Sequence, residues 1–310
     1  MTHPRPDAGT TGSVPRGAGP RLLAWAELLR LPALFTVPGD ALAGAAAAGR
    51  RPGPRTLLAV GCSLCLYEAG MALNDWADRA EDAAERPHRP LPSGRVRPTA
   101  ALAAAGTLTA AGLALAVRAG RGALAVAVPL AATVWAYDLV LKRTFAGPAA
   151  MAAARGLDLL LGAAATGGGV RPALPSAAAL AVHTLAVTAV SRGETRGGSP
   201  VVPLAALAAT GSLSWALTRG PTSARAPRSA AHVLRAAFTA AYAATSARPL
   251  LHAALNPSPP LTQRAVGGGI RAMIPLQAAL AARSGALTSA LLTAALAPAA
   301  RRFAKQVSVT

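Results

Sequence analysis

Carboxylates and aromatic rings are scarce in this 310-residue chain, which carries 12 Asp and Glu against 31 Lys and Arg. Charged residues make up 14% of the sequence, whereas a soluble domain carries about 25%, so a soluble globular domain is a poor fit. The two cysteines, Cys62 and Cys65, are too few for a disulfide framework or a zinc finger. They lie three residues apart in an apolar run, and we interpret them as small core residues rather than a redox pair.

Long apolar runs take the place of charge. Apolar residues form 53% of the chain, and the mean hydropathy is +0.39. Helices and closed barrels are the structures that satisfy the backbone in lipid, and these runs lack the alternation of barrel strands. We therefore predict an all-α polytopic membrane protein with about nine transmembrane helices. The predicted spans are 22–48, 57–75, 99–117, 122–141, 149–169, 173–191, 201–218, 229–247 and 274–299.

The segments outside these spans complete the domain plan. Residues 1–20 are rich in Pro and Gly and are predicted to be a disordered tail that does not resemble a signal peptide. Residues 21–303 form one transmembrane domain, and residues 304–310 form a C-terminal tail. The stretch 248–273 is predicted not to cross the membrane, because it is polar and contains several Pro and Gly residues.

The net charge of +19 suggests anionic partners of some kind. A nucleic-acid interface needs a basic face on a soluble module. The sequence shows no such module, so we predict no nucleic-acid partner. Basic loops would instead favour membrane lipids with anionic headgroups. With the N-terminus inside, the inner segments hold sixteen basic residues and the outer segments twelve. This bias predicts that the loop after the second span faces the cytoplasm. The Ala, Gly, Pro and Arg-rich composition indicates a GC-rich genome, and we expect a bacterial cytoplasmic membrane.

The few carboxylates are concentrated in one place. Six of the twelve fall between Glu68 and Glu85, in and before the stretch "LNDWADRAEDAAERPHRPLPSGR" at residues 73–95. If the second helix continues, Asn74, Asp78 and Asp82 share one face, with Asp75 beside them. Oxygen ligands without His or Cys suit Mg²⁺, which often shares its coordination with substrate phosphates.

Arginines follow the acidic stretch, among prolines that end the helix. Arginine binds phosphate through two parallel hydrogen bonds, so Arg86, Arg89 and Arg95 complete the pattern of a diphosphate site. The alternative is a solvated loop whose acidic and basic residues neutralise each other. The apolar surroundings and the helical spacing favour the diphosphate site.

The pattern NDxxDxxxD at residues 74–82, followed by "RPHRPLPSGR", resembles the first aspartate-rich motif of the UbiA superfamily of intramembrane prenyltransferases. The DGxxAR pattern of CDP-alcohol phosphotransferases is absent from the sequence. Residues 137–163 are similar to the superfamily's Tyr–Lys segment, which implies that Tyr137, Lys142 and Arg143 help to hold diphosphate. Arg155 and Asp158 lie in the next span, where they either line the pocket or form a structural ion pair.

The second motif departs from the superfamily pattern, which usually has a second DxxxD near the end of the sixth span. Here "VSRGETRGG" at residues 190–198 offers one carboxylate, Glu194, between Arg192 and Arg196. This segment and "GGGIRAMIPLQAA" at residues 267–279 resemble the EboC-like branch. A single carboxylate implies a weaker second Mg²⁺ site, whose missing charge the two arginines would partly replace.

The resemblance implies that the helices are bundled around a central apolar cavity. It also implies Mg²⁺-dependent transfer of a prenyl group from a polyprenyl diphosphate to a small-molecule acceptor within the membrane. The acceptor would be aromatic or otherwise electron-rich. The implied metal ligands are Asn74, Asp75, Asp78, Asp82 and Glu194, of which Asp75, Asp78 and Glu194 carry the catalytic role. The implied diphosphate contacts are Arg86, Arg89, Tyr137, Lys142, Arg192 and Arg196. Two alternatives stay open: a non-catalytic protein that binds or exports an isoprenoid or other lipid-like product, and a terpene cyclase of the same superfamily.

Overall fold

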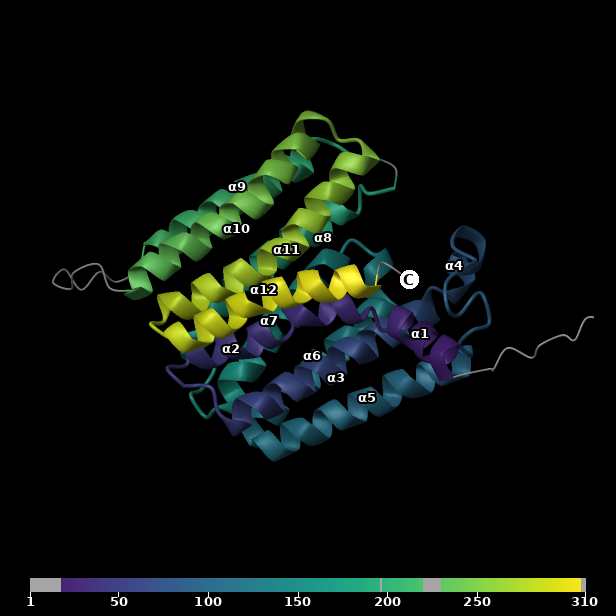
Figure 1. Ribbon diagram of the computed structural model, residues 1–310, viewed down its shortest axis with the longest axis horizontal. Helices are drawn as coiled ribbons and strands as arrows, with labels where there is room; N and C mark the ends of the chain where they lie inside the picture. The colour runs from purple at the N-terminus through teal and green to yellow at the C-terminus, as the bar shows by residue number, and fades with distance from the viewer. Residues whose placement is uncertain (1–17, 196, 220–229, 308–310) are drawn as a thin grey trace, which may run out of the picture.

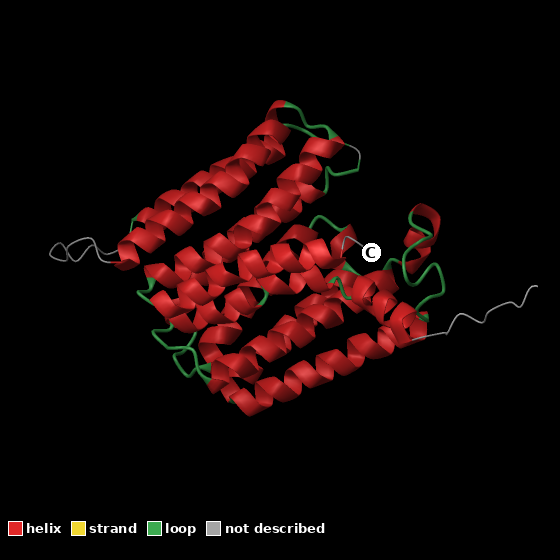
Figure 2. Cartoon of the chain, in the orientation of Figure 1, coloured by secondary structure: helices red, strands yellow, loops and turns green. Residues whose placement is uncertain are grey.

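The computed structural model describes residues 18–195, 197–219 and 230–307. Helices and loops make up the whole of this described part, which contains no strand (Figure 2). The predicted all-α class is therefore confirmed. The α-helices are α1 Ala18–Leu28, α2 Pro38–Ala47, α3 Pro54–Ala77, α4 Arg79–Glu85, α5 Pro98–Ala119, α6 Arg121–Leu139, α7 Gly147–Ala165, α8 Leu174–Ser191, α9 Val201–Thr218, α10 Ala230–Leu255, α11 Pro259–Arg283 and α12 Leu287–Val307. Three short 3-10 helices join them, η1 Leu31–Thr36, η2 Leu141–Arg143 and η3 Arg171–Ala173.

Most of the helices lie side by side in one bundle (Figure 1). α3 packs along α5 and α6, α7 lies between α6 and α8, and α10 packs along α9 and α11. The short helix α4 stands at one end of the bundle, near α1. The loops that follow α3, α6 and α8 meet at this same end, which we call the α4 end.

Six helices among the described residues are long and apolar enough to cross a membrane: α3, α5, α6, α8 with η3, α9 and α11. The predicted count of nine is not confirmed by this criterion. The predicted first span is interrupted, because Pro32 opens η1 and Pro38 opens α2. Arg30, immediately before η1, adopts a left-handed backbone conformation with φ of 49°.

Two predictions about the C-terminal third were wrong. The stretch 248–273 is helical almost throughout, because α10 continues to Leu255 and α11 begins at Pro259. α11 tolerates its polar and small residues because neighbouring helices surround it, burying 78% of its most apolar window. The predicted span 274–299 is in turn divided by the turn between α11 and α12. As a result α12 runs back toward the α4 end and packs against η1 and α2 (Figure 1).

Glycines allow α2 and α7 to pack backbone against backbone. A side chain at Gly44 would lie 1.9 Å from the carbonyl oxygen of Leu159, and one at Gly162 would lie 2.4 Å from that of Ala41. Small residues at such contacts are typical of helix packing in membranes, where close approach replaces the hydrophobic effect. The junction of α2 and α7 is therefore tight, and α7 in turn lines the cavity described below.

Candidate functional site

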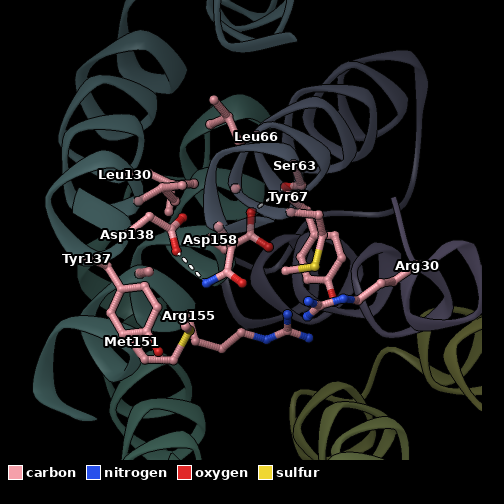
Figure 3. A pocket seen from close by; sticks show the side chains of 15 residues that line it. Arg30, Ser63, Leu66, Tyr67, Leu130, Tyr137, Asp138, Met151, Arg155 and Asp158 are labelled. Carbon is pink, nitrogen blue, oxygen red and sulfur yellow. Dashed lines mark hydrogen bonds between the residues drawn. The ribbon is translucent and has the colours of Figure 1, made fainter. Parts of the chain in front are cut away.

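A cavity of about 240 Å³ opens between α3, α6 and α7. Figure 3 shows side chains from these three helices and Arg30 pointing into the same space. Asn74, Tyr137 and Asp138 line the cavity toward the α4 end, while Ser63 and Asp158 line it deeper in the bundle. The predicted cavity thus exists, but it carries polar groups at both levels, with mostly apolar walls and the Tyr67 ring between them.

The acidic segment lies just beyond the α4 end of this cavity, and of its metal-ligand candidates Asn74 is the one that lines the cavity. α3 ends at Ala77, and Asp78 separates it from α4, although backbone hydrogen bonds of 2.9 and 2.8 Å link residues 74, 78 and 82 across the junction. Asp75 and Asp82 are both buried, and the guanidinium of Arg89 lies between them, 3.6 Å from Asp75 and 2.8 Å from Asp82. Arg89 thereby holds the chain after α4 against the end of α3.

Further cations surround the same carboxylates. Arg30 pairs with Asp75 at 2.9 Å, and Arg86 lies 3.8 Å from Asp82. Asp78 faces a different partner, the 3-10 helix η2, where Lys142 lies at 2.7 Å and Arg143 at 3.1 Å. The structure therefore joins the acidic segment to the Tyr–Lys segment, which lies more than 60 residues further along the chain.

The predicted face of Asn74, Asp78 and Asp82 is not assembled as one group. The Asn74 amide donates a hydrogen bond of 3.0 Å to Asp138, away from the other two residues. Within the described ranges, no three His, Cys, Asp or Glu side chains are arranged so that they could hold a metal ion together. The donor chemistry still suits Mg²⁺, because it consists of oxygens alone. Asp75 and Asp82 also already accept one shared cation, the guanidinium of Arg89.

The segment that carries Glu194 lies near the acidic segment at the same end. The Arg192 guanidinium donates to the carbonyl oxygen of Thr144, just beyond η2. Burial, the larger influence, raises the pKa of Glu194, and the positive charge of Arg86 lowers it in part. Arg86 is thus close to both Asp82 and Glu194. Arg196 lies outside the described residues.

Arg155 and Asp158 occupy the deeper end of the cavity, and their contacts combine the two roles left open by the sequence. Arg155 pairs with Asp40 at 2.9 Å and donates a hydrogen bond of 2.9 Å to the carbonyl oxygen of Thr36. Asp158 accepts a hydrogen bond from the Ser63 hydroxyl. Both residues line the cavity. The ion pair that forms is with Asp40 on α2, which the sequence had not singled out.

Sequence reasoning also missed Arg30 and Asp138. Arg30 interrupts the first apolar run, and Asp138 is one of only twelve carboxylates and follows Tyr137 directly. Both line the cavity, and both contact residues of the first motif. The scarcity of charge in this chain was the signal that could have found them.

Comparison with known proteins gives three kinds of match. The model of the UbiA prenyltransferase family matches residues 34–256. A digeranylgeranylglyceryl phosphate synthase of Natronomonas pharaonis is 33% identical over 168 residues, which cover 54% of this chain and 61% of that protein. The protein of the same name from Methanopyrus kandleri is 35% identical over 126 residues, covering 39% and 45%. The chain therefore matches about three fifths and under half of the lengths of these two curated relatives.

Solved structures share the fold at low sequence identity. A UbiA homologue from Archaeoglobus fulgidus, bound to DMAPP and Mg²⁺, aligns with a TM-score of 0.59 at 15% identity, covering 86% of this chain and 99% of that one. An apo UbiA homologue from Aeropyrum pernix aligns with a TM-score of 0.58 at 18% identity, covering 80% and 96%. These matches identify the fold and not the narrower EboC-like branch, which stays a prediction.

Proposed function

This chain belongs to the UbiA prenyltransferase family, and we propose that it transfers a prenyl group from a prenyl diphosphate to an acceptor within the membrane. The observation that carries the proposal is the arrangement at the α4 end of the cavity. Three aspartates of the first motif face five cationic side chains there, drawn from three separate segments of the chain: Arg30, Arg86, Arg89, Lys142 and Arg143. Carboxylates that can hold a metal and cations that can hold phosphate are the two halves of a diphosphate site.

The proposed metal ligands are Asn74, Asp75, Asp78 and Asp82, with Glu194 facing them from the second motif. Bound Mg²⁺ would neutralise charge on the diphosphate leaving group and so favour its departure. The UbiA homologue from Archaeoglobus fulgidus, bound to DMAPP and Mg²⁺, supports this choice of ion. The ion pairs that now occupy Asp75 and Asp82 would open as the donor binds, and Arg89 would turn from carboxylate to phosphate.

The protein's own groups would act on the rest of the donor. Lys142, Arg86, Arg89 and Arg192 would bind phosphate oxygens at the α4 end, and Tyr137 would contact them from the cavity wall. The apolar walls, among them Val134, Ala154 and Met71, would hold the prenyl chain. A site enclosed by helices excludes water, so that the electrophilic carbon meets the acceptor before it meets a hydroxide or water molecule. The acceptor we propose is an electron-rich small molecule, aromatic or otherwise.

We place the α4 end in the cytoplasm, because the basic residues favour that orientation. From α2 to α8, the segments at the α4 end, 78–97, 140–146 and 192–195, carry eight Lys and Arg: Arg79, Arg86, Arg89, Arg95, Arg97, Lys142, Arg143 and Arg192. The segments at the opposite end of the same helices, 48–55, 118–121 and 166–173, carry six: Arg50, Arg51, Arg55, Arg118, Arg121 and Arg171. A cysteine placed at the exposed Ala83 should react with an impermeant thiol reagent only from the cytoplasmic side. Reaction from the outside alone would reverse the orientation.

One observation favours a non-catalytic alternative. Glu194 is the last carboxylate in the sequence, so the second motif has one acidic residue where the family usually has two. A protein that only binds or exports an isoprenoid would need the cavity but not a complete second metal site. The third candidate, terpene cyclisation, uses the same donor site without an acceptor.

One assay separates these candidates. Purified protein in detergent or lipid discs is incubated with Mg²⁺ and prenyl diphosphates of 10 and 15 carbons, with and without a lipid extract that supplies acceptors. We expect diphosphate release that needs the extract and stops in EDTA. Release without the extract, together with a hydrocarbon product, would identify a cyclase. Saturable donor binding without release in either condition would support the binding protein and contradict our proposal.

A further inference from the structure

The deep end of the cavity carries charges that the proposed chemistry does not use. We propose that Asp158 and Ser63, backed by the ion pair of Asp40 and Arg155, form a polar floor that limits the prenyl donor to about three five-carbon units. The inference rests on the proposed function for the identity of the donor. It adds a donor length class and the residues that set it.

The depth of the cavity follows from helix geometry. Asn74 and Ser63 both line it from α3, and they are eleven residues apart. At 1.5 Å of rise per residue, the two side chains are separated by about 16 Å along the helix. On α7, Met151 lines the cavity nearer the α4 end, and Asp158 follows two turns deeper.

Most of the wall between these two levels is apolar, and Tyr67 on α3 adds an aromatic ring with a hydroxyl group (Figure 3). Leu66, Gly70 and Met71 line the cavity from α3, and Val134 lines it from α6. A prenyl chain whose diphosphate is held beyond Asn74 would lie along these walls, with its far end pointing toward Ser63 and Asp158. The polar groups at the floor would therefore meet the tail and not the reacting carbon.

The floor is a connected network of buried groups. Asp158 accepts a hydrogen bond from Ser63, and its carboxyl group lies close to that of Asp40. Asp40 is fully buried, pairs with Arg155 at 2.9 Å and accepts a hydrogen bond of 2.6 Å from Gln277. An apolar chain that passed this level would separate charged and polar groups from their partners, which is costly where water cannot replace them.

The floor also has little freedom to move aside. It is built on α2, α3, α7 and α11, and the glycine contacts hold α2 against α7 at backbone distance. The Gln277 amide donates to the carbonyl oxygen of Thr36 at 2.8 Å as well as to Asp40, so α11 is tied to the same corner. A longer chain could not be accommodated by a rotamer change of one residue.

Length arithmetic then gives the limit. Each five-carbon unit advances the chain by about 5 Å, because it contributes four bonds of about 1.5 Å in zigzag. A depth of about 16 Å therefore holds three units. Donors of 10 and 15 carbons fit above the floor, and a 20-carbon donor must press its last unit against Asp158.

Binding of prenyl diphosphates to the purified protein tests the proposal. Titration calorimetry in Mg²⁺ is carried out with donors of 5, 10, 15, 20 and 30 carbons, and diphosphate release is measured in parallel. We expect affinity to rise up to 15 carbons and to fall at least tenfold at 20. If affinity continues to rise beyond 15 carbons, the proposal that a polar floor limits the donor length is wrong. If binding shows the expected length limit but no diphosphate is released, the transferase proposal is wrong and the proposed polar floor is still supported. Absence of binding for every donor would overturn both.

Two variants, on different walls, should shorten the space available to the prenyl chain. Ala154→Phe on α7 and Val134→Phe on α6 each place a ring in the apolar section, and each should move the preferred donor from 15 to 10 carbons. The matched controls are Ala153→Phe and Val128→Phe, exposed positions on the same two helices, which should keep the parent preference. Either folded lining variant is sufficient for the test. An unchanged preference in a folded lining variant, or an equal shift in its control, would contradict the proposal.

Discussion

Two segments at the α4 end, residues 74–89 and residues 190–195, differ in how much charge they bring to the proposed site. In the first, Asp75, Asp78 and Asp82 lie within eight residues, and each has at least one cation within 4 Å. In the second, Glu194 is the single carboxylate, and the chain contains no other acid after Asp158. The first segment therefore offers several ligands to a metal, while the second offers one.

This difference predicts an unequal division of work. Removing one carboxylate from a group of several also disturbs the positions of the remaining ligands. Removing a lone carboxylate only weakens metal binding at its site, and a higher metal concentration can partly restore that binding. The first segment should then be essential for ionisation of the donor, and the second should tune it. The three predictions below test this division, in order of decreasing effect.

Asp78→Asn should cause the largest loss. The substitution keeps size and hydrogen bonding but removes the charge that pairs with Lys142 and Arg143, so the metal and the phosphate contacts are both disturbed. We expect diphosphate release to fall about 10³-fold or more, equivalent to ~4 kcal/mol of transition-state stabilisation. The control is Glu85→Gln, an exposed acid at the end of α4. If a folded Asp78→Asn protein retains more than a tenth of the parent rate, the first segment is not essential for ionisation of the donor.

Glu194→Gln should have an intermediate effect. Loss of one ligand charge should reduce diphosphate release by about 10²-fold, or ~3 kcal/mol. Raising Mg²⁺ should recover part of the rate, since a weakened site refills by mass action, and Glu194→Asp should keep more activity than Glu194→Gln. Mg²⁺ titrations of parent and variant, normalised to folded protein, measure this. If the two curves coincide, Glu194 is not a metal ligand and the second segment has only a structural role.

The smallest expected effect concerns pH. Burial raises the pKa of Glu194, so on acidification this group takes up its proton at a higher pH than an exposed glutamate does. If the ionised form is required, the acid limb of the rate profile lies above the usual glutamate range near 4.3. Arg86→Gln removes the nearby positive charge that favours the ionised form, so the limb should move further up in pH. Profiles of relative rate against pH for parent, Arg86→Gln and Glu194→Gln check this. An acid limb that stays unchanged in Glu194→Gln would assign it to another group.

Local features of the sequence predicted the class of the fold, which the structure confirms, and the place of the proposed site. Apolar runs at bilayer length indicated helices without reference to any partner, and the carboxylates stood out because the rest of the chain has so few. The same reasoning failed for α11, whose Gly, Gln and Arg residues look too polar to span. Their environment is supplied by α8 and α10, and no local pattern reports it. A side chain added at Gly269, for example, would meet Val187 of α8 at 2.4 Å.

The sequence by itself determined an all-helical membrane chain with one dense oxygen-donor segment, because hydropathy, helical period and residue chemistry are properties of neighbouring residues. Tertiary structure alone decided which charges meet. Arg89 lies between Asp75 and Asp82, Lys142 reaches Asp78, and Arg155 pairs with Asp40 instead of the adjacent Asp158. Gln277 reaches Asp40 across 237 residues of sequence. Such pairings depend on how helices pack around a shared cavity, and that packing is set by backbone approach at small residues far apart in the chain.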